Sequence, residues 1–428
     1  MKQYTVAIIG LGGRGLHTYA KYAKLHPERM KIVAVADIIP EKVTFAGDTY
    51  GVPQSGRFNS AESLLEREKL ADVLIIATQD RQHRDHTLKA LDRGYDVLLE
   101  KPISTFANEC IEIRDAAKKA GKLVTVCHVL RYAPFFRKIK EVILSGAIGK
   151  PVTVNALENV GYWHQAHSFV RGNWRNDQIE SPMILQKCCH DFDILAWLLD
   201  KRCLAVSSFG SLEYFREENA PKGSAARCVD CAVGDSCPYN AVKIYFDSEI
   251  GFNRGNREWP CDILVQQPTA ETLMEAIRKG PYGKCVFRCD NNVVDHQIVN
   301  MQMEDNVTVS LTMTAFTAVN TRHVKVMGTL GEIVAEQDKN LVTVTPFGGE
   351  STVYDIAAIA DDLSGHGGGD NRMLTEMFDA LDCGGDVSSS VADSVASHLS
   401  ALAAEKSRVS GGELITIADF ERENCKQK

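Results

Sequence analysis

The sequence predicts an α/β protein in two parts: an N-terminal doubly wound parallel sheet, then an α+β region with antiparallel strands. The first part is indicated by short apolar runs that alternate with helix-like stretches up to about residue 130. The second part is indicated by longer segments, after residue 150, in which apolar and polar residues alternate. Such alternation is typical of an antiparallel sheet that covers a core with one face.

Strands and helices follow one another regularly in the first part. Gly121 closes the last of these helices, as glycine commonly does just after a helix C-terminus. Strands that alternate with helices form a parallel sheet, because each helix crosses back over the sheet. The strands are expected at 5–9, 31–36, 72–77, 95–99 and 122–127, and the helices at 60–68, 83–93 and 107–120.

The second part has a different pattern, and the change near residue 150 is a shift in composition rather than a flexible linker. Strands are expected at 152–160, 296–303, 307–316 and 323–327, and helices at 182–199, 371–383 and 391–410. We therefore expect three regions along the chain. They are a doubly wound domain at 1–130, a second domain at 131–370 with a cysteine-rich insertion near 213–266, and C-terminal helices at 371–428 that pack back on the core.

A glycine-rich turn stands where the first strand is expected to lead into a helix. Gly10, Gly12 and Gly15 form a G-x-G-x-x-G pattern, with Gly13 and Arg14 inside it. One glycine makes the tight turn, one lets a pyrophosphate approach the backbone, and one lets the helix pack closely on the strand. The pattern predicts a dinucleotide whose phosphates lie at the N-terminus of the following helix.

An acidic residue follows the second strand. Asp37 stands roughly 20 residues after the last glycine, at the usual spacing for an adenosine ribose contact. A carboxylate there accepts hydrogen bonds from the ribose hydroxyls and repels a 2′-phosphate, so NAD is favoured over NADP. The alternative is a glycine-rich turn in some other α/β protein.

The composition excludes several classes of partner. A net charge of −8 argues against nucleic acid and against an anionic membrane surface. No apolar run approaches the roughly 20 residues that a transmembrane helix needs. The glycine turn begins at residue 10 and leaves no room for a signal peptide, and 13 cysteines without such a signal suggest reduced thiols. We therefore expect a cytoplasmic protein.

Several motifs follow the glycine turn in a fixed order. They are Asp37, Thr78-Gln79-Asp80 with His83, Glu100-Lys101-Pro102, Val129-Leu130-Arg131-Tyr132-Ala133-Pro134, Gly149-Lys150-Pro151 and Cys189-His190-Asp191-Phe192-Asp193. Together they resemble the Gfo/Idh/MocA family, which includes glucose–fructose oxidoreductase, inositol dehydrogenase and related sugar dehydrogenases. The resemblance covers most of the chain.

The resemblance implies a Rossmann domain and a second domain with a large, mostly antiparallel sheet. One face of that sheet carries the substrate site and often an oligomer interface, so a homodimer or homotetramer is expected. The implied cofactor contacts are Gly10, Gly12, Gly13, Arg14, Gly15, Asp37, Thr78, Gln79, Asp80, His83, Glu100, Lys101 and Arg131.

Two catalytic residues are implied by the same resemblance. Lys101 is expected beside the nicotinamide and the reacting hydroxyl, where it relays a proton or polarises the oxygen. His190 is expected to take the substrate proton. The alternatives are a solvated lysine paired with Glu100 and a histidine held in the core.

The chain departs from the family pattern four residues before His190. The family commonly has an aspartate there, whereas this chain has Gln186. A glutamine can hydrogen-bond a sugar hydroxyl but cannot share its proton at pH 7. Gln186 is therefore expected to orient the substrate, and neighbouring Lys187 to be a supporting or surface charge.

A segment rich in aromatic and polar residues at 161–175 is typical of a carbohydrate site. The expected substrate contacts in it are His164, His167, Arg171, Trp174 and Arg175. The alternative is an amphipathic loop that covers the sheet edge. A further stretch, 366–370 (His-Gly-Gly-Gly-Asp), predicts either a lid or polar cradle, or a helix N-terminus capped by Asp370.

Three clustered cysteines are not explained by a dehydrogenase core. Cys228, Cys231 and Cys237 have the spacing of metal ligands, and zinc takes four. The fourth could come from Cys261, Cys285 or Cys289. The sequence leaves open a structural zinc or a plain set of thiols, and disfavours an iron–sulfur cluster.

These features favour an NAD-dependent dehydrogenase that acts on a ring hydroxyl of a sugar, cyclitol or glycoside. The alternative is an NAD-dependent glycosidase, which oxidises the ring transiently, eliminates the aglycone and returns the hydride. A catalytically inactive sensor is disfavoured because Lys101 and His190 are both present.

Overall fold

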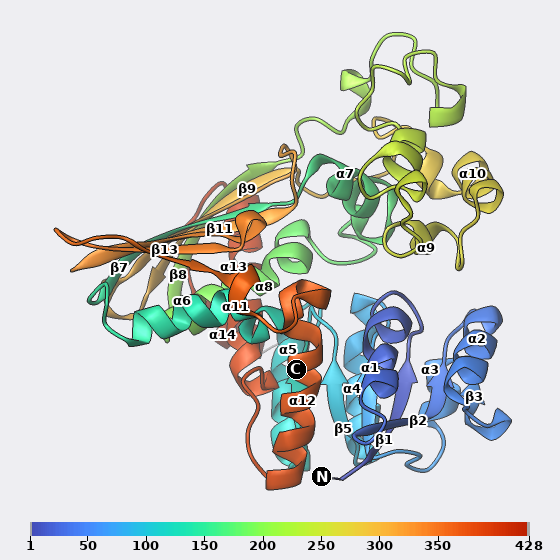
Figure 1. The fold of residues 1–428 in the computed structure, drawn as a ribbon, viewed down its shortest axis with the longest axis horizontal. Coiled ribbons are helices and arrows are strands. Elements are labelled where there is room, and N and C mark those ends of the chain that lie inside the picture. The colour runs from blue at the N-terminus through green and yellow to red at the C-terminus, as the bar shows by residue number, and fades with distance from the viewer. Residues whose placement is uncertain (1, 426–428) are drawn as a thin grey trace.

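The computed structural model describes residues 2–425 and contains two sheets. Figure 1 shows the N-terminal α/β part below, the larger sheet at the left, and a lobe of short helices and loops at the upper right. The predicted fold class, a parallel Rossmann sheet followed by a mostly antiparallel sheet, is confirmed.

The first sheet has six parallel strands in the order β3-β2-β1-β4-β5-β6. Each strand expected from the sequence is present, with ends that differ by up to two residues, and β3 is additional because its two residues were too few to form a pattern. The strands are β1 (Tyr4–Ile9), β2 (Met30–Ala36), β3 (Arg57–Phe58), β4 (Val73–Ile76), β5 (Asp96–Leu99) and β6 (Val124–Val126). The helices are α1 (Ala20–Leu25), α2 (Pro40–Tyr50), α3 (Ala61–Leu65), α4 (His83–Asp92) and α5 (Ala107–Ala120).

The second sheet has nine strands in the order β14-β13-β12-β11-β7-β10-β9-β8-β15. Within residues 2–425, β7 and β10 pair in parallel and the other neighbours pair antiparallel. The strands are β7 (Pro151–Asn159), β8 (Cys203–Ser211), β9 (His296–Met303), β10 (Thr308–Thr314), β11 (Thr321–Gly328), β12 (Gly331–Glu336), β13 (Leu341–Pro346), β14 (Thr352–Asp355) and β15 (Ile415–Thr416).

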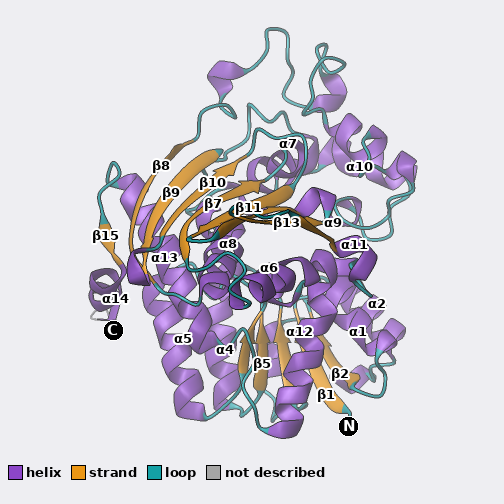
Figure 2. Cartoon of the chain, turned by 60° about the vertical axis from the view of Figure 1, so that its left-hand side comes forward, coloured by secondary structure: helices purple, strands orange, loops and turns teal. Residues whose placement is uncertain are grey.

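Helices cover one face of this sheet, and Figure 2 shows them between the sheet and the N-terminal part. In β9 the buried Val299 and Met301 alternate with the exposed Ile298, as a sheet with one covered face requires. The helices of this part are α6 (Pro134–Leu144), α8 (Met183–Leu199), α11 (Ile356–Ile359), α12 (Ser364–Cys383), α13 (Val391–Val409) and α14 (Ile417–Cys425).

Helix α12 returns the chain to the first sheet. Its Met373, Met377 and Phe378 are buried in one cluster with residues of β1 and α1. Phe378 stacks on Tyr4 with the ring centroids 5.4 Å apart. The two parts of the chain therefore share an apolar boundary, although the domain limits at residues 130 and 370 stay predictions.

The lobe contains α9 (Cys261–Leu264) and α10 (Ala270–Lys279) and has an apolar cluster of its own. It lies beside α7 (Tyr162–His164) and the helical turn Gln165–Arg171. The lobe also touches the glycine turn, where Ile263 lies next to Gly13, and the helix α1, where Lys21 pairs with Glu258 at 2.7 Å. Within residues 2–425, no helix has the length and apolar character needed to cross a membrane.

Candidate active site

The glycine turn leaves an open place for phosphates after β1. A Cβ on Gly10 would lie 2.3 Å from the Ala77 oxygen, and a Cβ on Gly15 would lie 1.9 Å from the Gly10 oxygen. A Cβ on Gly12, in contrast, would have no atom within 4 Å. Two glycines are thus required by close backbone packing, and the third keeps free the space where a pyrophosphate approaches, so the turn fits a dinucleotide.

Asp37 is fixed at the end of β2. Its Oδ2 accepts a hydrogen bond from the Leu11 amide at 2.6 Å, and its Oδ1 accepts one from the Ile39 amide at 2.9 Å. A carboxylate has about four acceptor positions, so capacity remains for two ribose hydroxyls. The side chain stands beside the glycine turn, where the cofactor prediction requires it.

The loop after β4 is tied to the loop after β5. The His83 ring lies 2.7 Å from the Pro102 oxygen through Nδ1 and 3.2 Å from the Thr78 oxygen through Nε2. The Thr78 hydroxyl in turn contacts Nδ1 of His86 at 3.0 Å. These contacts hold the loops after β4 and β5 together at the carboxyl edge of the parallel sheet, where ligands bind in this architecture.

Asp80 connects this edge to the second part of the chain. The backbone of Gln79 caps the short turn that begins at Asp80, and the Asp80 side chain is buried. It accepts hydrogen bonds from Trp174 Nε1 at 3.2 Å and from the Ser181 hydroxyl at 2.5 Å. An expected cofactor residue and an expected substrate residue are therefore brought together.

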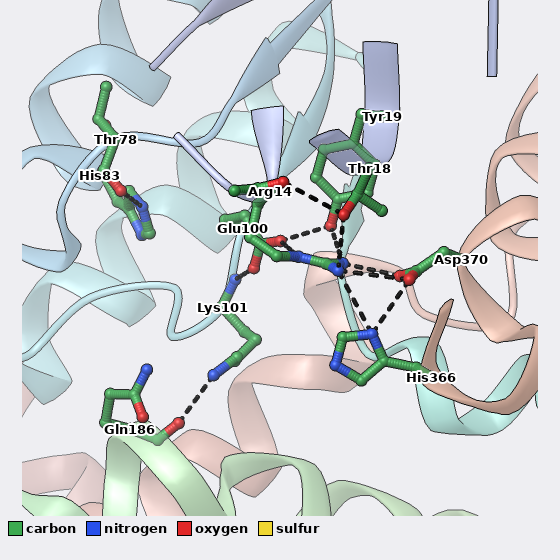
Figure 3. Close-up of polar contacts among 11 residues, drawn as sticks. Arg14, Thr18, Tyr19, Thr78, His83, Glu100, Lys101, Gln186, His366 and Asp370 are labelled. Carbon is green, nitrogen blue, oxygen red and sulfur yellow. Dashed lines mark hydrogen bonds and ion pairs between the residues drawn. The ribbon is translucent and has the colours of Figure 1, made fainter. Parts of the chain in front are cut away.

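Glu100 is held by three donors at the end of β5. Its carboxylate accepts from Arg14 Nε at 2.5 Å, from the Tyr19 hydroxyl at 2.5 Å and from the Lys101 amide at 2.9 Å. Burial acts to raise the pKa of Glu100, but the charges of Arg14 and Lys101 outweigh it, so the pKa is lowered. Glu100 is an anion that fixes Arg14 and the backbone of Lys101 (Figure 3).

The Lys101 side chain reaches across to α8. Its Nζ donates to the backbone oxygen of Gln186 at 2.9 Å (Figure 3). His190 lies one helical turn further along α8 and is 6% exposed. Burial and the charge of Lys101 lower the pKa of His190 well below its usual value. The two expected catalytic residues thus lie on facing elements, and the imidazole of His190 is held in its neutral form.

A third polar group enters from the N-terminal end of α12. Residues 365–368 form a left-handed turn, with φ values between +36° and +87°, before the regular helix. Asp370 accepts from Arg14 Nη2 at 2.7 Å and lies 3.1 Å from Nδ1 of His366. Helix α12 has no side-chain cap at its N-terminus, so the alternative that Asp370 caps it is wrong. The turn is a polar junction with the glycine turn.

The aromatic segment lies against the lobe. The ring centroids of His164 and Trp259 are 5.0 Å apart. Burial and the charge of Lys187 lower the pKa of His164 well below its usual value. The ring centroids of Trp163 and Trp259 are also 5.0 Å apart. The sequence reasoning missed Trp259, because it lies roughly 95 residues further along the chain in a segment without periodicity.

Three expected substrate residues are engaged by the lobe. Nδ1 of His167 lies 2.7 Å from the Tyr245 hydroxyl, and Arg171 is buried and donates to the Tyr239 oxygen at 2.7 Å. Arg175 pairs with Asp290 at 2.7 Å. These contacts anchor the segment to the lobe, and substrate contact by these residues stays a prediction.

Two family models match the chain. One, described as "Oxidoreductase family, NAD-binding Rossmann fold", matches residues 4–128. The other, described as "Oxidoreductase family, C-terminal alpha/beta domain", matches residues 140–415. The chain belongs to the Gfo/Idh/MocA family. The resemblance inferred from the motifs is confirmed, and the protein is an oxidoreductase with an NAD-binding Rossmann domain.

Proteins that are similar in sequence to this chain support the assignment to this family. The protein YteT of Bacillus subtilis (strain 168) is 24% identical over 72% of this chain and 72% of its own length. The inositol 2-dehydrogenase of Salmonella typhimurium (strain LT2) is 28% identical over 45% of this chain. The matched part is 54% of that enzyme, so the chain spans about half the length of this relative.

Solved structures show the same fold. An inositol dehydrogenase homologue complexed with NAD+ from Azotobacter vinelandii superposes with a TM-score of 0.70, at 15% identity, over 97% of each chain. An oxidoreductase from Agrobacterium radiobacter, in complex with NAD+, L-tartaric acid and magnesium, gives 0.69 at 16% identity, over 98% of this chain and 99% of that one. At these identities the likeness concerns the fold alone.

Arg131, a cofactor contact by the family pattern, is occupied by another partner. It is buried and donates to both Asp193 oxygens, from Nε at 2.7 Å and from Nη2 at 2.6 Å. Beside this ion pair, the ring centroids of His128 and His190 are 5.7 Å apart. Arg131 thus joins two elements near His190, and its contact with the cofactor stays a prediction.

A buried ionic network supports α8 on the large sheet. Lys187 pairs with Glu158 at 3.1 Å, and Arg322 pairs with Glu158 at 2.8 Å and with Asp191 at 2.8 Å. Burial raises the pKa of Asp191 to about 6. Lys187 is a supporting charge and not a surface one. The sequence did carry a signal for Glu158, which occupies an inward position of an alternating strand.

The expected zinc site is not supported. Within residues 2–425, no group of three or more Cys, His, Asp or Glu side chains is arranged to hold a metal ion. Arg171 Nη2 lies 3.4 Å from the Cys228 sulfur, and a guanidinium in that place disfavours a second cation. Burial raises the pKa of Cys237 and so favours its thiol over the thiolate that binds zinc.

Proposed function

We propose that this protein is an NAD-dependent dehydrogenase that oxidises a ring hydroxyl of a sugar, cyclitol or glycoside. The observation that carries the proposal is the placement of Lys101 and His190 on facing elements at the carboxyl edge of the parallel sheet. Lys101 follows β5 and reaches the Gln186 oxygen on α8, and His190 lies one turn beyond on the same helix. Nearby stands a glycine turn that fits a dinucleotide.

The residues divide the binding of the cofactor among them. The backbone amides around Gly12 would hold the pyrophosphate, and Asp37 would hold the adenosine ribose. When bound, the nicotinamide ring accepts the hydride or returns it. Because Asp37 repels a 2′-phosphate, we propose that NAD is used in preference to NADP.

The catalytic pair handles the hydroxyl. The Lys101 ammonium can hold and polarise the hydroxyl oxygen, because its Nζ retains donors beyond the one given to Gln186. His190 is a neutral imidazole at neutral pH and can accept the hydroxyl proton. Gln186, buried on the same helix, can orient a neighbouring hydroxyl through its side-chain amide.

A screen of sugars, cyclitols and glycosides tests this proposal. We expect NAD-dependent formation of NADH, detected at the absorbance band of reduced nicotinamide, with at least one ring alcohol. In Lys101→Met and His190→Asn the turnover should fall by about two to four powers of ten, while NAD affinity stays within about twofold. Lys118→Met, on the exposed end of α5, is the matched control and should behave like wild type.

Product analysis distinguishes the dehydrogenase from the glycosidase. A ketone accompanied by free NADH supports the proposal. A cleaved aglycone without net NADH would establish the glycosidase instead. The relatives reported above are named as oxidoreductases or dehydrogenases where an activity is named, and they favour the first outcome.

We further propose that the protein is a homodimer or homotetramer formed through the outer face of the large sheet. Large apolar side chains are exposed there, among them Leu157 (39%), Phe209 (54%) and Ile298 (42%). Apolar side chains gathered on an uncovered sheet face indicate an interface. Light scattering on a Phe209→Glu/Ile298→Glu variant should give a smaller particle than wild type. A monomeric wild type would refute this assembly.

A further inference from the structure

His366 is held in an unusual backbone position beside the catalytic pair. Its φ is +47°, in the left-handed region that most residues with a side chain avoid, and its neighbours Gly365 and Gly367 are also left-handed. Such a conformation costs about 1 kcal/mol or more and persists only when the surroundings enforce it. Here Gly369 packs tightly under the backbone of Val129, which fixes the turn against the Rossmann domain.

The imidazole of His366 is oriented by a carboxylate. Nδ1 lies 3.1 Å from Asp370 Oδ2 and 3.3 Å from Arg14 Nη1. We assign the Nδ1 proton to the shorter contact, with the carboxylate, because Arg14 already donates to both Asp370 oxygens. Nε2 is then the acceptor nitrogen, and Figure 3 shows it facing the side on which Lys101 ends.

His366 also reaches His190, and the two rings differ in their surroundings. Their centroids are 6.0 Å apart. His190 is 6% exposed and lies near Lys101, whereas the His366 side chain is 39% exposed. A proton on His190 is therefore poorly hydrated and repelled by a neighbouring cation, whereas His366 has contact with water.

Charged groups from three elements surround His366. Arg14 brings one positive charge from the glycine turn, while Glu100 and Asp370 bring two negative charges, one from the end of β5 and one from α12. Lys101, whose backbone amide donates to Glu100, adds a second positive charge, so the group holds two cations and two anions. His190 faces the ring from α8 and is itself neutral.

We propose that His366 is the proton exit of the dehydrogenase: it takes the reaction proton from His190 and releases it to solvent. This inference rests on the proposed function. As the alcohol is oxidised, its O–H bond breaks and an N–H bond forms on His190. The proton then passes to Nε2 of His366 and on to water, while the hydride leaves the carbon for the nicotinamide. Asp370 acts as a positioning residue for the His366 ring.

The first test requires no substrate. In the full-length protein labelled with ¹³C at histidine Cε1, the signal absent from His366→Asn should move with pH, and the signal absent from His190→Asn should not. Asparagine is chosen because it tolerates the left-handed backbone and can still donate to Asp370, but cannot carry the proton. A His366 signal that stays fixed while the His190 signal moves would overturn the proposal.

The second test uses the alcohol that the screen identifies. His366→Asn should lower turnover about tenfold to a hundredfold, less than loss of a direct proton acceptor, and NAD affinity should stay within about twofold. The pH profile of turnover should change shape, and added imidazole should restore part of the rate. A purely structural role would change neither. His26→Gln, a half-exposed histidine beside Glu28, is the matched control.

The outcomes separate the two proposals. Wild-type turnover and an unchanged pH profile in His366→Asn, with an active wild type, refute the proton exit and leave the dehydrogenase intact. A loss confined to NAD affinity refutes it as well. A wild type that oxidises no ring alcohol refutes the proposed function, and the histidine spectra then still decide whether His366 takes up a proton.

Discussion

The glycine turn allows folding and cofactor binding to be separated by two substitutions three residues apart. In Gly12→Ala the added methyl meets no atom within 4 Å, so the free protein should fold normally. A Gly→Ala change at a compatible backbone position commonly stabilises by about 0.4–1 kcal/mol through the unfolded chain. The same methyl occupies the space that a pyrophosphate needs.

The expected loss of affinity follows from the hydrogen bonds involved. Displacing the phosphates from one backbone amide removes a hydrogen bond to a charged group, worth about 1.5–3 kcal/mol. NAD should therefore bind to Gly12→Ala roughly 10- to 150-fold more weakly than to wild type. In Gly15→Ala the methyl would lie 1.9 Å from the Gly10 oxygen, a backbone atom that cannot turn away. This variant should lose about 1–3 kcal/mol or more of unfolding free energy.

Thermal unfolding of the free protein and calorimetric titration with NAD measure the two effects. Gly385→Ala is the control, because its Cβ also meets no atom within 4 Å and it lies outside the turn. If Gly12→Ala binds NAD within twofold of wild type, the turn does not hold the pyrophosphate. If Gly12→Ala unfolds as readily as Gly15→Ala, the reasoning about space around the two residues is wrong.

Three further predictions concern the cofactor preference, a carboxyl group and a buried pair. Asp37→Ser should narrow the gap between NAD and NADP affinity, measured by calorimetry, and equal affinities in wild type would contradict the role of this carboxylate. Burial and Asp80 raise the pKa of Glu180 to about 7 from 4.5, so the free energy of unfolding falls as pH rises between these values. Glu180→Gln, which cannot ionise, should raise the melting temperature relative to wild type at pH 8 and have little effect at pH 4. An equal gain at both pH values would exclude ionisation as the cause. Arg131→Ala should cost about 3–5 kcal/mol of stability in denaturant unfolding, because Asp193 is left buried and unpaired, and a double variant with Asp193→Ala should recover part of that loss.

Local patterns predicted much of the fold. The helix over 107–120 with Gly121 as its C-cap, and the strand over 296–303, have the limits expected from the sequence. These elements are encoded in apolar spacing and terminal residues, which depend on near neighbours along the chain. Strands β12 and β13 were missed, because each has only six residues and the partners that pair with them lie outside the local pattern.

The proposed catalytic residues were also identified from local motifs, and their role stays a prediction. Lys101 and His190 stand in motifs that can be read locally, and the structure brings their elements together. The cysteine spacing was also local and left zinc or plain thiols open, because it contained no information about the guanidinium of Arg171 beside Cys228, which disfavours zinc. The spacing of cysteines along the chain suggests metal ligands, but only the packed structure shows which other side chains lie beside them.

The sequence by itself determined the Rossmann turn, the acidic residue after β2 and the family of the chain, since each depends on a few residues close together. Only the tertiary structure decided the environment of the proposed catalytic pair. Arg14 meets Asp370 across 356 positions of the chain, and Arg322 meets Asp191 across 131. Such partners are brought together by the path of the whole chain through two sheets. The local hydrophobic pattern contains no information about that path.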